Sequence, residues 1–498
     1  MARLFLFAIG GTGSRVLKSL VFLLASGVKP KYNEYEIIPI IIDPHQSNKD
    51  LKRTTDLLEW YQQIFKECGT DSGFFSTQIS TLKDLVKSET QISDTFKFNL
   101  QEVSDKRFKD FIDLDGFEND SPNKALMEIL FSGKTADKSG NEIDLMELQM
   151  DMGFVGNPNI GSIVLNQFKE SAEFKEFASN FNNSDRIFII SSIFGGTGAA
   201  GFPIILKNIR GARTLETDVD GRGYLENSMI GALTVMPYFN IKKESKSPIQ
   251  KSDFISKTKQ ALYYYKENVT GNNSINAMYY LGDDYIGMPY ENDPGANGQQ
   301  NDAHFVELAA ALSIIDFLEI PESKLKCKNG VAINPVYKEY GIENDTDSVK
   351  FKDLSDATLE KISLQMCQFY LFYKYMTEQL NAAIVGQAWC KDSPLINSTF
   401  EEYKSLKKIL EQYYIWLSEL SENKRSFSPI LLKNTITNFI ADIISSKKVN
   451  FSVFDHILNG KSEIGNFNNE VHKLVHLFYD STKELLTENY DYFRRISK

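Results

Sequence analysis

The sequence predicts an α/β fold with a parallel sheet, followed by a helical C-terminal third. The strongest observation is residues 186–201, where an apolar, β-branched run leads into four closely spaced glycines and then into a helix-like apolar run. The same order recurs at residues 4–27. A further apolar run at residues 36–43 completes a strand–helix–strand order, which is typical of a parallel sheet.

The two glycine segments have nearly the same sequence. The first contains Gly10, Gly11, Thr12, Gly13 and Ser14, and the second contains Gly195, Gly196, Thr197, Gly198 and Ala199. Glycine adopts positive φ without strain and lets the backbone approach a ligand, and the amides of a helix N-terminus attract anions. Each segment could be an ordinary tight turn, but their repetition favours two contacts with phosphate.

Length and composition bound the class of protein. The 498 residues are enough for two or three domains, and 42% hydrophobic with 24% charged residues is typical of a soluble globular chain. No apolar run reaches the ~18–20 residues of a membrane helix, so no membrane span is predicted. The first 28 residues resemble a signal peptide, but Arg15 and Lys18 interrupt the apolar segment, and we interpret them as part of the fold.

Charge and cysteine content narrow the partners and the compartment. A net charge of −11 argues against an electrostatic nucleic-acid binder. The four cysteines are scattered, which predicts neither a disulfide framework nor a zinc site and fits a cytoplasmic location. His472 and His476 are one helical turn apart, but no further ligand lies nearby in the sequence, so no metal site is predicted.

The N-terminal half has two further candidate contacts. Asp43 ends the second predicted strand, where such folds meet a ribose or a metal, although it could also close the turn before Pro44. Gly156 and Asn157 belong to a third glycine-containing loop, which could face the same ligand or be a plain turn with Ser162 as a helix cap. Residues 51–150 are polar and helix-prone, and we expect an insertion there.

The rest of the chain continues the pattern and then changes. Strands are expected at residues 229–239 and 275–284, and a long apolar helix at 303–320. From about residue 354 apolar residues recur at helical spacing, and Ser428 with Pro429 has the composition of a helix start. The predicted organisation is a nucleotide-binding domain at 1–320, a connecting segment at 321–353 and a helical domain at 354–498.

The central segment FIISSIFGGTGAAGFPIILKNI resembles the signature loop of the tubulin and FtsZ superfamily of GTP-binding cytoskeletal proteins. AIGGTGS resembles the first phosphate loop of that superfamily, VMPYFNIKKESK its ribose segment, and NDAHFVELAAAL the start of its central helix. The four segments come in the order of the family and cover roughly residues 1–320. The chain resembles a divergent prokaryotic tubulin-like protein.

This resemblance implies a guanine-nucleotide site with GTP or GDP and Mg²⁺. The two glycine segments would hold the phosphates, Asp302 would recognise guanine, and Asp43 is a weak candidate for the outer shell of the metal ion. The remaining positions implied by the resemblance are Pro237, Phe239, Glu244, Lys246 and Asn301.

Three departures from the family limit what the resemblance implies, and one of them is that the helical C-terminal third does not look like the β-sheet second domain of FtsZ. The asparagine that also holds guanine in FtsZ falls near Gly282, and the water-activating pattern after the central helix is not recognisable, so the catalytic residue is unknown. The leading hypothesis is a tubulin-like protein whose nucleotide state controls self-assembly or the binding of a protein partner through the C-terminal helices, with a possible GTPase activity on assembly.

Two alternatives remain. One is a nucleotide-gated interaction module without catalysis. The other is a dinucleotide-dependent oxidoreductase that uses Gly11, Thr12, Gly13 and Asp43, although Val16 occupies the position of the third glycine.

Overall fold

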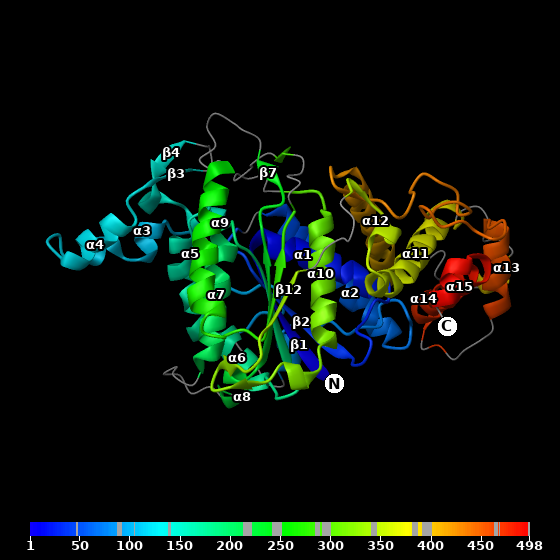
Figure 1. The fold of residues 1–498 in the computed structure, drawn as a ribbon, viewed down its shortest axis with the longest axis horizontal. Coiled ribbons are helices and arrows are strands. Elements are labelled where there is room, and N and C mark those ends of the chain that lie inside the picture. Colours follow the sequence, from blue (N-terminus) through cyan, green and yellow to red (C-terminus); the bar gives the residue numbers. More distant parts are fainter. Residues whose placement is uncertain are drawn as a thin grey trace.

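The computed structural model shows a central sheet with helices on both faces and a helical region beside it (Figure 1). It describes the chain except for residues 46–47, 87–91, 104, 138–140, 213–221, 242–250, 284–288, 291–299, 340–345, 381–386, 391–400, 463–466, 468 and 497–498. The predicted α/β class with a parallel sheet is confirmed.

The central sheet has six strands in the order β12-β8-β6-β5-β1-β2, and every pair is parallel. The strands are β1 (Ala2–Ile9), β2 (Tyr35–Ile42), β5 (Arg186–Ser192), β6 (Met229–Val235), β8 (Ala277–Leu281) and β12 (Val336–Glu339). From β1 the chain first adds β2 on one side, and then crosses to add β5 and the later strands on the other side. The order therefore reverses between β1 and β5.

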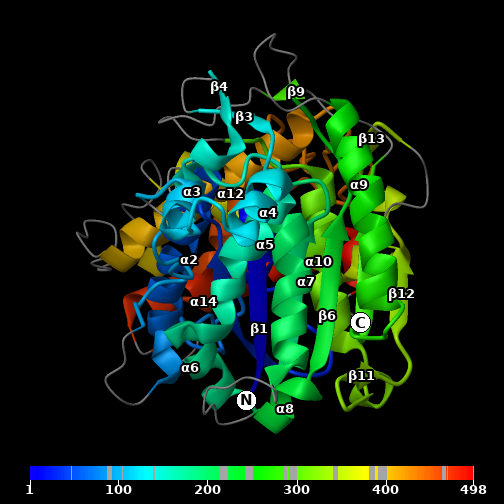
Figure 2. The same ribbon diagram turned by 90° about the vertical axis from the view of Figure 1, so that its left-hand side faces the viewer.

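Alternate residues of the strands pack against two different layers. Leu4, Leu6 and Ala8 face the layer of α1 (Gly10–Ala25), α2 (Lys49–Cys68) and α10 (Phe305–Glu319). Phe5 and Phe7 face the layer of α5 (Pro158–Leu165), α6 (Ala172–Asn180), α7 (Gly196–Arg210) and α9 (Lys251–Tyr265) (Figures 1 and 2). The sheet is buried on both faces, as its near-continuous apolar strands require.

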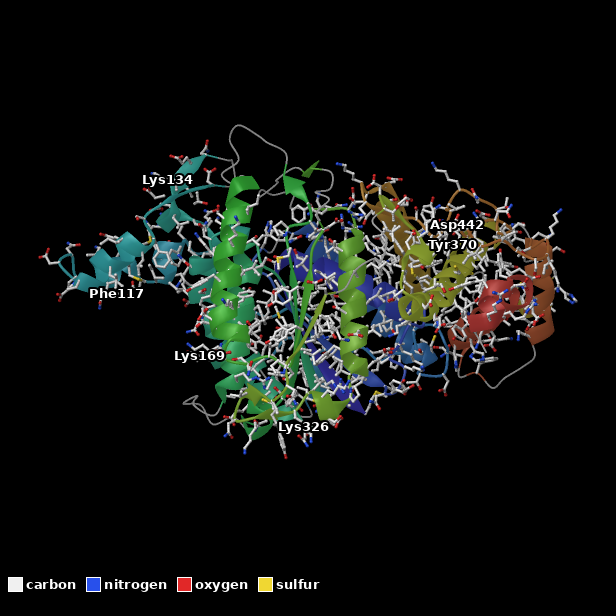
Figure 3. The ribbon with its side chains drawn as sticks, in the orientation of Figure 1. Phe117, Lys134, Lys169, Lys326, Tyr370 and Asp442 are labelled. Atoms are coloured by element: carbon white, nitrogen blue, oxygen red, sulfur yellow. The ribbon has the colours of Figure 1, made fainter. Side chains whose placement is uncertain are left out.

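The helical region packs on the α1–α2 side of the sheet. It contains α11 (Asp356–Glu378), α12 (Glu401–Glu422), α13 (Phe451–Lys461), α14 (Glu470–Asn489) and α15 (Asp491–Ile496). One cluster of buried residues runs from Leu4 in the sheet to Phe493 in α15. Tyr370 lies inside this region and donates its hydroxyl to the carbonyl of Leu432 (Figure 3). The core therefore continues across residue 354.

The helix start expected at Ser428 and Pro429 is wrong. This segment is irregular, and the carbonyl of Pro429 accepts from the amide of Ala441, while Leu431 donates to Phe439. Ile430 forms an isolated antiparallel bridge with Ile440. These pairings fold the segment back on itself, so the apolar residues are buried without helical periodicity.

The described elements between residues 108 and 144 project from the side of the molecule opposite the helical region (Figures 1 and 2). This projection contains α3 (Phe108–Phe111), α4 (Pro122–Leu130) and the pair β3 (Lys134–Ala136) and β4 (Glu142–Asp144). None of the residues of α4 is buried. By contrast α2, which lies in the range expected as an insertion, packs in the main layer through Leu57, Tyr61 and others.

The remaining short elements connect the larger ones. They are α8 (Arg222–Glu226), the pair β7 (Asn240–Ile241) and β9 (Pro289–Tyr290), the pair β10 (Cys327–Lys328) and β11 (Val331–Ala332), and the pair β13 (Ser348–Val349) and β14 (Ser426–Phe427). Among the described helices, none has the length and apolar character to cross a membrane.

Candidate functional site

The two glycine loops meet at the carboxyl edge of the sheet. β1 and β5 are neighbouring parallel strands, so the loops that follow them lie side by side. A Cβ on Gly10 would lie 3.4 Å from the Cβ of Thr197 and 3.7 Å from the amide nitrogen of Gly198. This is the point where the strand order reverses, which is where open parallel sheets bind their ligands.

The glycines of the two loops differ in why glycine is present at each position. A Cβ on Gly13 would lie 2.6 Å from the carbonyl carbon of Ala8, and one on Gly198 would lie 2.6 Å from the carbonyl oxygen of Ser192. These two glycines let each helix pack directly on its preceding strand. Four other residues of the two loops are instead partly exposed, namely Gly11, Gly195, Thr197 and Ala199.

Both helices begin without a capping side chain. The N-cap residues are Ile9 for α1 and Gly195 for α7, and neither first turn carries an acidic residue. The orphan amides and the positive ends of two helix dipoles are therefore directed at one place. This arrangement favours an anion with several oxygens.

The third glycine loop contacts the second. A Cβ on Gly196 would lie 3.0 Å from the amide nitrogen of Asn157 and 3.1 Å from that of Gly156. Gly196 is thus a glycine because these amides approach it. Ser162 does not cap α5, as the alternative interpretation required, because it lies within the helix and donates to the carbonyl of Pro158 at 2.9 Å.

Asp43 lies on the other side of the first loop. Its carboxylate accepts from the amide of His45 at 3.0 Å and from Nδ2 of Asn48 at 3.3 Å, so it closes the turn after β2. A Cβ on Gly11 would lie 3.3 Å from that same Nδ2. Burial raises the pKa of Asp43 to about 6, although its hydrogen bonds oppose the shift. A cavity of ≈ 220 Å³ opens beside it, with Thr95 and Lys97 in its wall.

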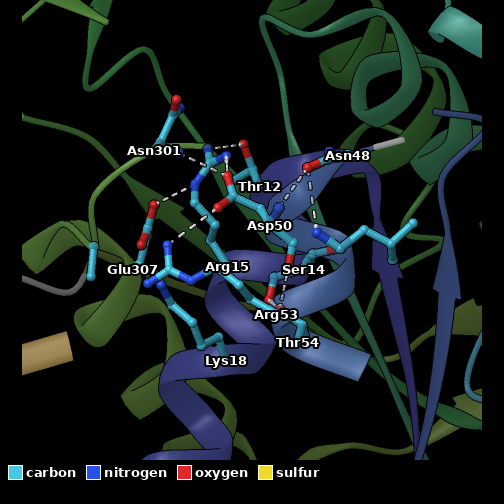
Figure 4. A network of polar contacts seen from close by, with 12 residues as sticks. Thr12, Ser14, Arg15, Lys18, Asn48, Asp50, Arg53, Thr54, Asn301 and Glu307 are labelled. Atoms are coloured by element: carbon cyan, nitrogen blue, oxygen red, sulfur yellow. Dashed lines mark hydrogen bonds and ion pairs between the residues drawn. The ribbon is translucent and has the colours of Figure 1, made fainter. Parts of the chain in front are cut away.

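A buried polar network centred on Arg15 lies beneath the first loop (Figure 4). Arg15 donates to Glu307 at 2.7 Å, to Asp50 at 3.2 Å and to the hydroxyl of Tyr238 at 2.8 Å. Tyr238 donates in turn to Glu307 at 2.6 Å. Arg15, Asp50 and Glu307 are at most 4% exposed, and each charge has an opposite charge beside it.

Two of the predicted base and ribose positions, Asn301 and Phe239, contact this network. The amide of Asn301 donates to Asp50 at 3.2 Å, and the side chain of Asp302 is exposed at the surface beside it. The guanidinium of Arg15 lies over the ring of Phe239 at 5.6 Å, and Pro237 is partly exposed nearby in sequence. Glu244 and Lys246 lie outside the described residues.

Sequence reasoning missed several residues that organise the site, notably Arg15 as a network centre, Glu307 and Tyr238. A signal was available for two of them. Arg15 is a cation in a helix whose other residues are almost all apolar or small, and Glu307 is an acid in a similar apolar helix. Buried charges of this kind require partners, and the two helices supply each other's.

Comparison with known proteins gives little independent information. No protein-family model matches the chain, and no curated protein matches it. Among solved structures it is similar to CetZ from Methanosaeta thermophila strain DSM 6194, at 11% sequence identity and a TM-score of 0.26, over 57% of this chain and 46% of that one. The chain therefore spans less than half the length of that relative.

Proposed function

We propose that the chain binds a guanine nucleotide, with the phosphates on the loops at residues 10–14 and 195–199. The observation that carries this proposal is the meeting of two uncapped helix N-termini at the point where the strand order reverses. The orphan amides supply donors for phosphate oxygens, and the exposed Asp302 supplies an acceptor for the ring N–H and amino group of guanine. Mg²⁺ is expected with a triphosphate, and Asp43 is the candidate for its outer shell.

The nucleotide state then controls self-assembly or the binding of a protein partner. The resemblance to tubulin and FtsZ supports this role. Ala303, next to Asp302, donates its amide to Glu419 in α12 and accepts from Nδ2 of Asn423 just after that helix, so the base segment contacts the helical region. Hydrolysis needs a positioned water and a base in addition to amide donors. Glu307 is a carboxylate of the network beneath the first loop, but both of its oxygens already accept hydrogen bonds, so it does not supply that base. We therefore propose that any GTPase activity depends on assembly or on a partner.

A charge substitution at Thr197 tests the phosphate site. Thr197 is partly exposed in the first turn of α7, and aspartate and asparagine have similar shapes there. Thr197→Asp places a carboxylate where the phosphate would bind and should weaken GTP binding by about 100-fold or more, whereas Thr197→Asn should weaken it by about tenfold or less. Calorimetry with GTP, GDP, ATP and NAD measures both effects. Equal affinities of the two variants for GTP would contradict the proposal.

The base preference is tested at Asp302. Asp302→Asn replaces an acceptor with a donor opposite the guanine N–H and should cost ~1–3 kcal/mol in GTP binding. ATP that binds the wild-type protein as tightly as GTP would rule out this assignment. Tight binding of NAD alone would favour the oxidoreductase instead.

Turnover is tested by a concentration series. Specific activity that rises with protein concentration together with pelletable polymer would support hydrolysis coupled to assembly. Activity that is high and constant at nanomolar protein would instead show a complete active site in one chain. No activity at any concentration would favour the nucleotide-gated module.

A further inference from the structure

We propose that Glu419 in α12 is a positioning residue that preserves the preference for guanine, because it holds two nearby cations away from Asp302. This inference rests on the proposed nucleotide site, in which Asp302 accepts hydrogen bonds from the base. Glu419 is 116 positions from Ala303, the neighbour of Asp302, so no local pattern in the sequence indicates such a role.

Glu419 joins three elements beside the base segment. Its Oε2 accepts from the amide of Ala303 at 3.0 Å and from Nζ of Lys18 at 3.3 Å. Its Oε1 accepts from Nη2 of Arg53. Lys18 belongs to α1 and Arg53 to α2, and both are drawn with the polar network around Arg15 (Figure 4). One carboxylate of the helical region therefore binds both cations next to the residue that would recognise the base.

Asp302 lies within range of the same charges. Burial and then the charge of Glu419 raise the pKa of the Asp302 carboxyl, while Arg53 and Lys18 lower it. The two cations therefore attract this carboxylate as well as that of Glu419. In the part of the chain that the structure describes, however, the exposed side chain of Asp302 forms no hydrogen bond and no ion pair. Its oxygens thus remain available to the N–H donors of a base.

An ion pair with a cation would remove this availability. A guanidinium donates to a carboxylate through two parallel N–H bonds, which would occupy the oxygens that guanine needs. Arg53 is the cation suited to do so, because its side chain is 18% exposed against 4% for that of Lys18. Its Nη1 has no hydrogen-bond acceptor among the described residues, and Oδ1 of Asp50 is 3.8 Å away. Arg53 thus has a spare donor, and its ion pair with Glu419 keeps that donor from Asp302.

The first test measures the preference for guanine as the ratio of the dissociation constants of ATP and GTP, by calorimetry on the full chain. Glu419→Gln keeps an oxygen for the amide of Ala303 but loses the charge that holds Arg53. Arg53 should then pair with Asp302, and the ratio should fall by about tenfold, since hydrogen bonds to a charged group are lost. Inorganic tripolyphosphate, which has no base, should bind with an affinity within about threefold of the wild type and shows that the phosphate site is intact.

Glu422 provides the matched control. It is an exposed acid at the end of the same helix, and its charge also acts on Asp302, but its carboxylate accepts from Ser418 at 3.1 Å and pairs with neither cation. Glu422→Gln should therefore leave the ratio within about twofold of the wild type. An unchanged ratio in Glu419→Gln, or an equal fall in Glu422→Gln, would overturn the proposal.

A second substitution separates this role from support of the fold. Glu419→Gln combined with Arg53→Met leaves no guanidinium to pair with Asp302, so the ratio should return to within about threefold of the wild type although more contacts are lost. A ratio that stays low in the double variant would overturn the proposal and leave Glu419 as a structural contact.

The exposed position of Glu422 also gives a test that does not depend on the folding of Glu419 variants. Glu422→Arg adds a guanidinium near Asp302 and should lower the ratio relative to Glu422→Gln, so equal ratios in these two variants would overturn the proposal. If the wild-type protein does not prefer GTP to ATP, it is the proposed function that fails. A wild-type preference that survives in Glu419→Gln is a failure of this inference alone.

Discussion

The N-termini of the helices at the sheet edge differ from those in the rest of the molecule. Asn48, His304, Asn450 and Asn469 cap α2, α10, α13 and α14 by accepting from amides of the first turn. α1 and α7 have no such side chain. α4, α5 and α11 also lack a side-chain cap, but α4 and α5 start with a proline, which removes one donor, and α11 carries Asp356 in its first turn. Among these helices, α1 and α7 alone have no capping side chain, no initial proline and no acid in the first turn, and they are the two that begin at the glycine loops.

The largest expected effect on stability comes from Arg15, whose ion pairs hold α1 in place although this helix has no capping side chain. Arg15→Met leaves Glu307 and Asp50 as buried carboxylates without their main partner, which should lower the free energy of unfolding by ~3–5 kcal/mol. Chemical denaturation measures the loss. The exposed pair of Lys52 and Asp56 provides the control, since Lys52→Met should cost less than ~1 kcal/mol. Equal effects would mean that α1 is held by other contacts.

The next-largest expected effect is a pH dependence of the stability that comes from Asp43. Its pKa rises from 3.8 to about 6, a difference of about 2 units, which corresponds to about 3 kcal/mol. Because the folded-state pKa is the higher one, the contribution of Asp43 to stability is full below pH 4 and is lost as the pH rises through 6. The stability of the wild type relative to Asp43→Asn should therefore fall by about 2 kcal/mol between pH 4 and pH 7. Denaturation curves that show a constant difference across this range would contradict the burial argument.

Removal of a true cap should have a smaller effect. Asn450→Ala removes the acceptor for the amide of Val453, 3.0 Å away, and should cost ~1 kcal/mol of stability without changing nucleotide affinity. Asn450→Asp keeps an acceptor and should remain close to the wild type. A change in GTP affinity in the alanine variant would remove the distinction between structural and ligand-facing helix ends.

The smallest expected effect on stability is at Thr197, and it tests the comparison of capped and uncapped helices most directly. Thr197→Asp adds a negative charge to the first turn of α7, and in the absence of ligand it should stabilise the protein by ~0.3–1 kcal/mol relative to Thr197→Asn. Thermal melts of the two variants measure this difference. The variant that loses phosphate binding would then be the more stable one. Such a trade-off is expected where backbone amides are left without acceptors so that a ligand can bind them.

The sequence predicted five of the six strands of the sheet and the proximity of the two glycine loops, because these follow from local hydrophobic patterns and the rules of parallel sheets. It missed β12, which lies in the stretch expected to be a connecting segment. It did not predict why each glycine is present, since Gly13 and Gly198 are needed for packing on the preceding strand. It also could not predict the partners of Arg15, because Glu307 is 292 positions away and no local pattern encodes that contact. The irregular segment after Ser428 was missed because it pairs with itself, between residues 429–431 and 439–441, and such pairing has no helical periodicity.

The contacts between α1 and α12 have a consequence for how the chain is made. Lys18 binds Glu419 across 401 positions of sequence, and Ser19 accepts from Trp416 across 397. At the usual ~5–20 residues per second of translation, α1 waits for ~20–80 seconds before these partners leave the ribosome. During that time its surface for α12 is uncovered, including the cation of Lys18. The docking of α12 onto α1 therefore comes long after α1 is made, and a chain released before residue 416 would leave that surface of α1 exposed to other proteins.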